Sequence, residues 1–114
     1  MLGCEYPIIQ TAMGWVAMPE LVAASSNAGA FGFLALATAG PKEAIEMMDQ
    51  TLALTDKPFG INFHMFQPGA DEIVQGVIDR KIKAVSYSGS PTPEFIQAFK
   101  EAGVICIPTV GALK

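Results

Sequence analysis

Two polar side chains interrupt an apolar segment in the middle of the sequence. Asn62 and His64 lie two residues apart within residues 59–64, and His64 is the only histidine of the chain. An unpaired buried amide costs roughly 1–3 kcal/mol, so Asn62 must either contact a ligand or link neighbouring strands. His64 can donate a hydrogen bond to a ligand or shape a pocket wall. Because no cysteine or carboxylate lies nearby in sequence, the segment predicts neither a metal site nor a catalytic triad.

Two further short segments combine glycine with residues that can contact a ligand. Met13 precedes Gly14 and can either pack against a planar ligand or fill the core. The segment from Ser88 to Ser90 can bind an anion through backbone N–H groups or form a plain turn. The sequence has neither a GxGxxG nor a GxxxxGK[ST] motif, so neither a dinucleotide-binding turn nor a P-loop is supported.

These candidates stand at the ends of apolar segments that predict β-strands. Five such segments are short and bounded by turn residues, as expected for strands buried on both faces: residues 7–13, 31–37, 59–64, 84–88 and 104–109. Between them, apolar residues recur at helical spacing in four segments: residues 18–27, 41–55, 71–81 and 93–102. Pro19, Pro41 and Pro93 mark helix starts, because the first helical residue needs no N–H.

The spacing of apolar residues also predicts which side of each helix is buried. These inner faces consist of Leu21, Val22 and Ala24 in the first helix, Ala44, Ile45, Met47, Met48 and Leu52 in the second, Ile73, Val74, Val77 and Ile78 in the third, and Phe95, Ile96 and Phe99 in the fourth.

The alternation of strands and helices predicts an α/β fold with a parallel sheet and right-handed crossovers. Two architectures fit: an open, doubly wound five-stranded sheet, and the N-terminal portion of a TIM-type (β/α)8 barrel. A doubly wound domain ends with a helix over its last strand, whereas residues 110–114 are all that follow the fifth predicted strand. We therefore expect residues 1–114 to form an incomplete barrel, its N-terminal half. In both architectures, ligands bind at the carboxyl ends of the strands.

The composition narrows the class of partner. The chain has 51% hydrophobic and 16% charged residues and a net charge of −4, and its seven basic residues are scattered. These features argue against a nucleic-acid partner. Neither a signal peptide nor the roughly 20 apolar residues of a membrane span is visible. Cys4 and Cys106 lack metal-ligand spacing, and we expect both to be reduced thiols in a cytoplasmic protein, with Cys106 a small buried hydrophobe.

Several runs of the sequence together resemble the nitronate monooxygenase family, formerly called 2-nitropropane dioxygenase. The first is PIIQTAMGW at residues 7–15, followed by LVAA at 21–24 and NAGAFG at 27–32. TDKPFGINF at residues 55–63 is similar to the family's third-strand motif, and EAGV at 101–104 with PTV at 108–110 matches the approach to strand five. Each run alone is modest, but their combination is specific and extends over nearly the whole chain.

The resemblance implies a fold, a cofactor and a reaction. Members of this family are FMN-binding (β/α)8 barrels that oxidise alkyl nitronates with O2 to carbonyl compounds and nitrite. It therefore implies a flavin enzyme whose partners are a small-molecule substrate, such as an alkyl nitronate, and O2. By position, it implies flavin contacts from Ala12, Met13, Gly14, Asn62, His64 and Thr109.

Two parts of the family's site have no counterpart in these 114 residues. The family's catalytic histidine lies in a glycine-rich segment after strand five, and its phosphate-binding glycines lie on strands seven and eight. No residue here is therefore assigned a catalytic role, and we expect the chain alone to bind FMN weakly or not at all. Two alternatives stay open: an enzyme similar to the FMN-dependent enoyl-ACP reductases, and a non-catalytic half-barrel that pairs with itself or with a separate C-terminal half.

Overall fold

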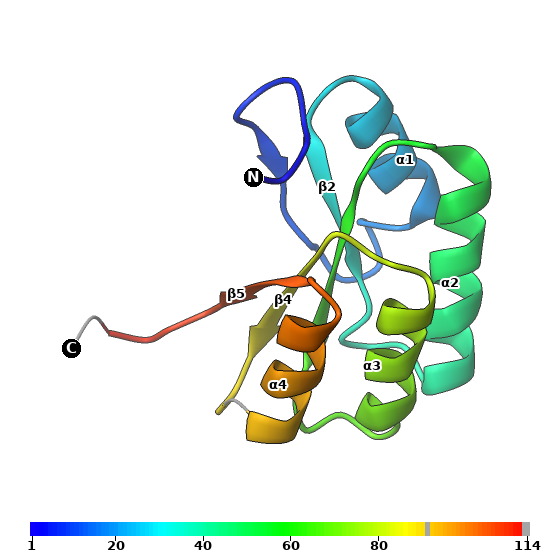
Figure 1. Ribbon diagram of the computed structural model, residues 1–114. Helices are drawn as coiled ribbons and strands as arrows, with labels where there is room; N and C mark the ends of the chain where they lie inside the picture. The colour runs from blue at the N-terminus through cyan, green and yellow to red at the C-terminus, as the bar shows by residue number, and fades with distance from the viewer. Residues whose placement is uncertain (91, 113–114) are drawn as a thin grey trace.

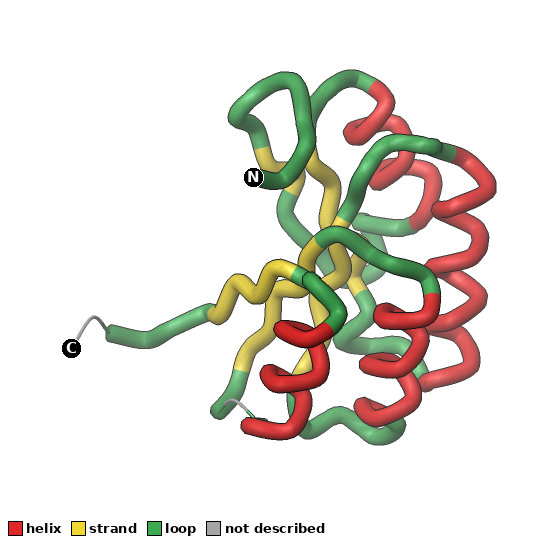
Figure 2. Tube along the Cα trace, viewed as in Figure 1, coloured by secondary structure: helices red, strands yellow, loops and turns green. Residues whose placement is uncertain are grey.

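The computed structural model describes residues 1–90 and 92–112 and confirms the alternation of strands and helices (Figures 1 and 2). The sequence predicts that Gly89, Ser90 and Pro91 form the turn after the fourth strand, and of these Pro91 lies outside the described residues. The elements follow the order β1 (Ile9–Gln10), α1 (Pro19–Asn27), β2 (Phe31–Ala35), α2 (Pro41–Leu54), β3 (Gly60–His64), α3 (Ala70–Asp79), β4 (Ala84–Ser88), α4 (Pro93–Glu101) and β5 (Ile105–Pro108).

The order of the strands decides between the two expected architectures. The five strands form one parallel sheet in the order β1-β2-β3-β4-β5, with β1 at an edge. All four helices cover the same face of this sheet, and the other face is open (Figure 1). A doubly wound sheet would carry helices on both faces and place its first strand inside the sheet. The fold is therefore that of the first five strands and four helices of a TIM-type barrel, as predicted.

The helix starts agree with the sequence because proline occupies the first turn of three helices. Pro19, Pro41 and Pro93 are the first residues of α1, α2 and α4. A first-turn residue has no intrahelical partner for its N–H, so proline costs nothing there and its fixed φ suits the helix.

The main core lies between the helices and the covered face of the sheet. Alternate strand residues reach it, including Leu34 from β2, Ile61 and Phe63 from β3, and Val85 from β4. The ring of Phe63 meets that of Phe99 from α4 edge to face, with 6.2 Å between ring centroids. This two-residue period leaves the other residues of each strand for the open face.

Two residues predicted for inner helix faces are exposed. Ala24 is exposed on α1, and the side chain of Leu52 on α2 is 41% exposed. The polar residues Ser26 and Thr51 are buried in these helices instead. The apolar pattern missed Thr51 because its hydroxyl is satisfied within the helix, by a 2.8 Å hydrogen bond to the carbonyl oxygen of Met47.

The predicted first strand was too long. Residues 7–13 were expected, but β1 is Ile9–Gln10, which pairs with Phe31 and Gly32 of β2. The backbone pairing ends at Gln10. The next contact with β2 comes from the Gln10 side chain, whose Nε2 donates to the carbonyl oxygen of Phe33 at 3.4 Å. The fourth predicted strand, by contrast, agrees with β4 residue for residue.

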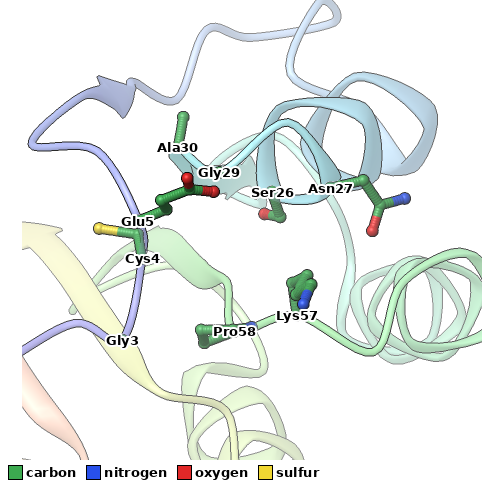
Figure 3. Close-up of a pocket in the computed structure, with 9 residues that line it drawn as sticks. All are labelled: Gly3, Cys4, Glu5, Ser26, Asn27, Gly29, Ala30, Lys57 and Pro58. Atoms are coloured by element: carbon green, nitrogen blue, oxygen red, sulfur yellow. The ribbon is translucent and has the colours of Figure 1, made fainter.

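The open face of the sheet has a small apolar cluster of its own. Phe31, Phe33 and Ala84 are buried there, and the half-buried Leu2 and Cys4 of the N-terminal segment pack against them. This segment also runs beside the end of α1, where the Glu5 and Tyr6 N–H groups both donate to the Gly29 carbonyl oxygen at 2.9 Å (Figure 3). The amino-terminal ends of the strands are thus closed by the chain itself.

The absence of a side chain at Gly60 leaves room for the ring of Phe33 on the open face. A Cβ atom on Gly60 would overlap the Phe33 ring and lie 3.0 Å from the carbonyl oxygen of Ala84. We expect Gly60→Ala to lower the free energy of unfolding by about 1–3 kcal/mol, because the ring cannot yield without losing its own contacts. Urea denaturation would measure the change. Gly111→Ala is the matched control, since its Cβ would meet nothing within 4 Å, and equal stabilities of the two variants would contradict this role of Gly60.

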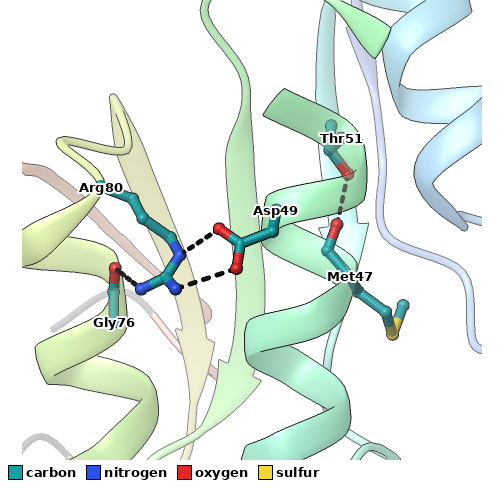
Figure 4. Close-up of polar contacts among 5 residues, drawn as sticks. All are labelled: Met47, Asp49, Thr51, Gly76 and Arg80. Atoms are coloured by element: carbon teal, nitrogen blue, oxygen red, sulfur yellow. Dashed lines mark hydrogen bonds and ion pairs between the residues drawn. The ribbon is translucent and has the colours of Figure 1, made fainter. Parts of the chain in front are cut away.

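An ion pair joins the outer surfaces of α2 and α3. Arg80 Nε and Nη2 donate to the two carboxylate oxygens of Asp49 at 2.7 and 3.0 Å, and Arg80 Nη1 donates to the Gly76 carbonyl oxygen at 3.3 Å (Figure 4). The hydrogen bond from Arg80 lowers the pKa of the Asp49 carboxyl group below its ordinary value. The Asp49 side chain is 56% exposed, so solvent screens most of this interaction.

The lowered pKa of Asp49 makes the contribution of this pair depend on pH. A carboxylate with a lower pKa in the folded state adds stability above its unfolded pKa, and this stability is lost as the pH falls through the folded pKa. We expect Asp49→Asn to cost less than about 1 kcal/mol at neutral pH and nothing in strong acid. Thermal unfolding of the variant and the wild type, measured from neutral pH to strong acid, checks the expectation. Glu46→Gln, on the exposed side of α2, is the control. A cost that persists in strong acid would show that the charge is not its cause.

Candidate functional site

A cavity of about 470 Å³ opens on the uncovered face, toward the carboxyl ends of the strands. In parallel α/β folds this edge is where ligands bind. The cavity brings together three of the predicted site residues, Ala12, Asn62 and Thr109, from segments that are far apart in sequence. Its complete lining consists of Ile9, Thr11, Ala12, Phe33, Asn62, Ser86, Ser88, Ile107 and Thr109.

Strand register explains why these residues meet. Asn62 is level with Ser86 on the neighbouring strand, and Ser86 is level with Ile107 on the next. One step toward the carboxyl ends, His64 is level with Ser88. All five side chains fall on the open face, because their strand neighbours Ile61, Phe63, Val85 and Tyr87 are buried under the helices.

Asn62 links two strands at the wall of this cavity. Its Nδ2 donates to Ser86 Oγ at 2.8 Å and lies 3.3 Å from the carbonyl oxygen of Ser86. The amide is half-buried, so it keeps contact with the cavity while it joins β3 to β4. The two roles considered for Asn62 in the sequence are therefore compatible, and the strand link is the one that the structure shows directly.

His64 stands at the rim of the cavity. Its Nδ1 forms a hydrogen bond with the hydroxyl of Ser88, while the side chain stays exposed. The backbone N–H of His64 donates to Gln67 Oε1 at 2.8 Å. Gln67 Nε2 in turn donates to the carbonyl oxygens of Leu36 and Ala39, at 3.0 and 3.2 Å. Gln67 thus ties the loop after β3 to the loop after β2.

Met13 and Gly14 lie in a turn beside the cavity and do not belong to its lining. The carbonyl oxygen of Met13 accepts hydrogen bonds from the N–H groups of Val16 and Ala17, at 3.1 and 2.8 Å. The Met13 side chain is 42% exposed, and a Cβ on Gly14 would meet nothing within 4 Å. Contacts from these two residues to a flavin stay a prediction.

Ser86 is the main site residue that the sequence did not identify. The signal for it is the alternation in β4, where Ala84, Ser86 and Ser88 are small or polar and the residues between them are large and buried. A strand with one apolar face and one small, polar face presents the second to a ligand or to solvent. Thr11, Phe33 and Ile107 were missed because their positions depend on pairing across the sheet.

The chemistry of the cavity is neutral. None of its nine described lining residues has an ionisable side chain. Within residues 1–90 and 92–112, no group of three or more His, Cys, Asp or Glu side chains lies close enough to hold a metal ion. The lining offers hydroxyl and amide groups beside the apolar surfaces of Phe33, Ile9 and Ile107, an arrangement that suits a flat, uncharged ligand surface.

The two cysteines take no part in this chemistry. Both are free thiols, in agreement with the sequence. Cys106 is half-buried against the helix-side core, and this burial raises the pKa of its thiol, so it is held in its unreactive form. No helix in the described part of the chain is long and apolar enough to cross a membrane.

A second cavity, of about 320 Å³, lies at the opposite, amino-terminal ends of the strands (Figure 3). Its lining includes the polar side chains of Cys4, Glu5, Ser26, Asn27 and Lys57. The Ser26 hydroxyl is buried and has no hydrogen-bond partner among the described residues. In (β/α)8 barrels the active site lies at the carboxyl ends of the strands, and residues at the amino-terminal ends contribute to stability.

Ser26 therefore offers a test of whether this second cavity is merely structural. A buried hydroxyl without a partner costs free energy, and alanine is the better helix former. We expect Ser26→Ala to raise the free energy of unfolding by about 0.5–1.5 kcal/mol, as measured by urea denaturation. Ser25→Ala, a half-buried neighbour on the same helix, is the control. A loss of stability in Ser26→Ala would contradict this expectation, because it would show that the hydroxyl stabilises the folded state.

Comparison with known sequences gives one family and two kinds of relative. The family model described as nitronate monooxygenase matches residues 1–76. Over all 114 residues, the chain is 40% identical to the (3aS,4S,5R,7aS)-5-hydroxy-7a-methyl-1-oxo-octahydro-1H-indene-4-carboxyl-CoA dehydrogenase of Rhodococcus jostii, and it covers 32% of that protein. It is 42% identical over 76 residues to the nitronate monooxygenase of Paraburkholderia phytofirmans, which is 66% of this chain and 21% of that one.

Solved structures agree with the fold. The M276A mutant of FabK from Thermotoga maritima superposes with a TM-score of 0.91 at 32% identity, over 97% of this chain and 37% of that one. Nitroalkane oxidase from Streptomyces ansochromogenes superposes with a TM-score of 0.87 at 26% identity, over 95% of this chain and 41% of that one. The chain thus spans about a third of the length of the curated relatives that match it throughout. Because the family model covers 76 of its 114 residues, the chain belongs to the nitronate monooxygenase family of flavin oxidoreductases.

Proposed function

We propose that this chain provides the flavin-ring side of an FMN-dependent oxidoreductase. The observation that carries the proposal is the neutral cavity at the carboxyl ends of the strands. All five strands or the loops that follow them contribute to it: Asn62 and Ser86 lie side by side in its wall, and Thr109 comes directly after β5. We propose further that residues 1–114 form the N-terminal part of an eight-stranded barrel, since the chain covers 32% of the relatives that match it over its full length.

The residues of the cavity fit an isoalloxazine ring. This ring is flat, with a polar edge of carbonyl and nitrogen atoms and an apolar edge of methyl groups. Asn62, Ser86 and Thr109 offer hydrogen bonds to the polar edge, while Phe33 and Ile107 offer apolar surface. No Lys or Arg belongs to this lining, so it does not fit the phosphate of FMN. We therefore assign the flavin ring to this part of the barrel and the phosphate to strands outside it.

The first candidate substrate is an alkyl nitronate. When bound, FMN would supply the electron acceptor for the nitronate, and O2 would supply the oxygen atom of the carbonyl product, with nitrite as the leaving group. The family model and the nitronate monooxygenase relatives support this reaction. Within this chain, the role of the cavity residues is to bind and orient the ring and to exclude water from its inner face.

The second candidate substrate is an acyl thioester, and it rests on the extent of the matches. The Paraburkholderia and Pseudomonas nitronate monooxygenases match 76 and 69 residues of this chain, whereas the Rhodococcus carboxyl-CoA dehydrogenase matches all 114. The latter match therefore includes β4, which contributes Ser86 and Ser88 to the cavity, and β5 with the residue after it, Thr109. A thioester stabilises a carbanion at the neighbouring carbon, as a nitro group does, so the same ring face can serve both substrates.

Anaerobic mixing of the flavin-loaded full-length protein with each substrate distinguishes the two candidates, because the true substrate bleaches the flavin absorbance.

Asn62 provides the test of the flavin site. In the full-length protein, we expect Asn62→Ala to weaken FMN binding roughly tenfold or more, because the ring loses an amide partner and Ser86 loses its donor. Titration of flavin-free protein with FMN, followed by flavin fluorescence, measures this affinity. Gln97→Ala removes an exposed amide from α4 and serves as the control. Unchanged FMN affinity in Asn62→Ala would count against the proposed site.

A further inference from the structure

We propose that Ser88 is a positioning residue for His64. Its hydroxyl donates a hydrogen bond to His64 Nδ1, which holds the proton of the neutral ring on Nε2 and presents an Nε2–H donor at the rim of the cavity. The proposal rests on the proposed function, because the ligand that this donor would meet is the flavin or the substrate bound to it.

The geometry places the pair at the cavity. His64 and Ser88 are level on neighbouring parallel strands, and both face the uncovered side of the sheet. Ser88 belongs to the cavity lining, and its Oγ forms a hydrogen bond with His64 Nδ1. The imidazole therefore contacts the cavity wall through its Nδ1 edge. Nε2 makes no hydrogen bond within the described residues and is left available to a ligand.

The backbone on both sides of the pair is held in place. Gln67 accepts the His64 N–H and anchors it to the Leu36 carbonyl oxygen of the preceding strand-end loop. On the other strand, the Ser88 carbonyl oxygen accepts a hydrogen bond from the Met65 N–H at 3.4 Å. Hydrogen bonds hold both backbones, and the Ser88 hydroxyl in turn restrains the side-chain torsions of His64.

The direction of this hydrogen bond decides what the histidine can do. A neutral imidazole has one N–H donor and one acceptor nitrogen, and the partner of one nitrogen sets the state of the other. When Ser88 donates to Nδ1, the proton stays on Nε2, and His64 donates to an acceptor in the cavity. An oxygen that gains negative charge during the reaction is stabilised by such a donor, because the donor is oriented before the reaction starts.

The tautomer can be observed directly by NMR in the flavin-free full-length protein. Protonated and unprotonated ring nitrogens give separate 15N signals, and His64→Asn identifies the signals of this residue in histidine-labelled protein. We expect wild-type protein and Ser88→Thr, which keeps a hydroxyl, to show a proton on Nε2. Ser88→Ala should show a mixture of tautomers, and Ser90→Ala, in the exposed turn nearby, should match wild type. A wild-type proton on Nδ1, or an unchanged spectrum in Ser88→Ala, would overturn the proposal.

Kinetics of the flavin-loaded enzyme give the functional readout. With the substrate that bleaches the flavin, we expect Ser88→Ala to lower kcat severalfold with little change in KM, and Ser88→Thr to restore it. Equal kcat values for Ser88→Ala and wild type would overturn the positioning role. Failure of FMN to bind would refute the proposed function. The NMR measurement needs no flavin, so it would still test the role of Ser88 independently.

Discussion

Five strands pair in parallel in the order in which they occur along the chain, and this pairing determines which residues meet. Each right-handed crossover returns its helix to the same face of the sheet, so all four helices share one core. The two-residue period of the strands then divides every strand between that core and the open face. Asn62 and Ser86 meet at the cavity for the same reason that Ile61 and Val85 meet under the helices: neighbouring strands keep one register.

Local signals made most of the fold predictable from the sequence. Proline at the first turn located three helix starts, and the turn residues around β4 gave its bounds without error. The predictions failed where a polar residue occupies a buried position, since an apolar pattern cannot register Ser26 or Thr51. The first strand was overestimated because an apolar run does not show where ladder pairing stops.

The site was predictable in part, for a physical reason. Asn62 and His64 were visible because an amide and an imidazole are unusual in an apolar strand. Ser86 and Gln67 were not, because their importance comes from partners 24 and 28 or more residues away. Nor can this part of the barrel separate nitronates from thioesters by itself. In the proposed function its residues would face the flavin ring, which both candidate reactions share, whereas no charged group that would recognise a phosphate or a carrier is among the nine residues that line the cavity.

The sequential strand order has a consequence for how the chain folds during synthesis. Each strand from β2 onward finds its partner in the strand made just before it, about one β/α unit upstream. Pairing across a single β/α unit costs less loop-closure entropy than pairing between strands at opposite ends of the chain. A chain leaving the ribosome can therefore add one strand and one helix at a time to a sheet that already exists, and the cavity face takes shape in the order Ile9, Phe33, Asn62, Ser86, Ile107.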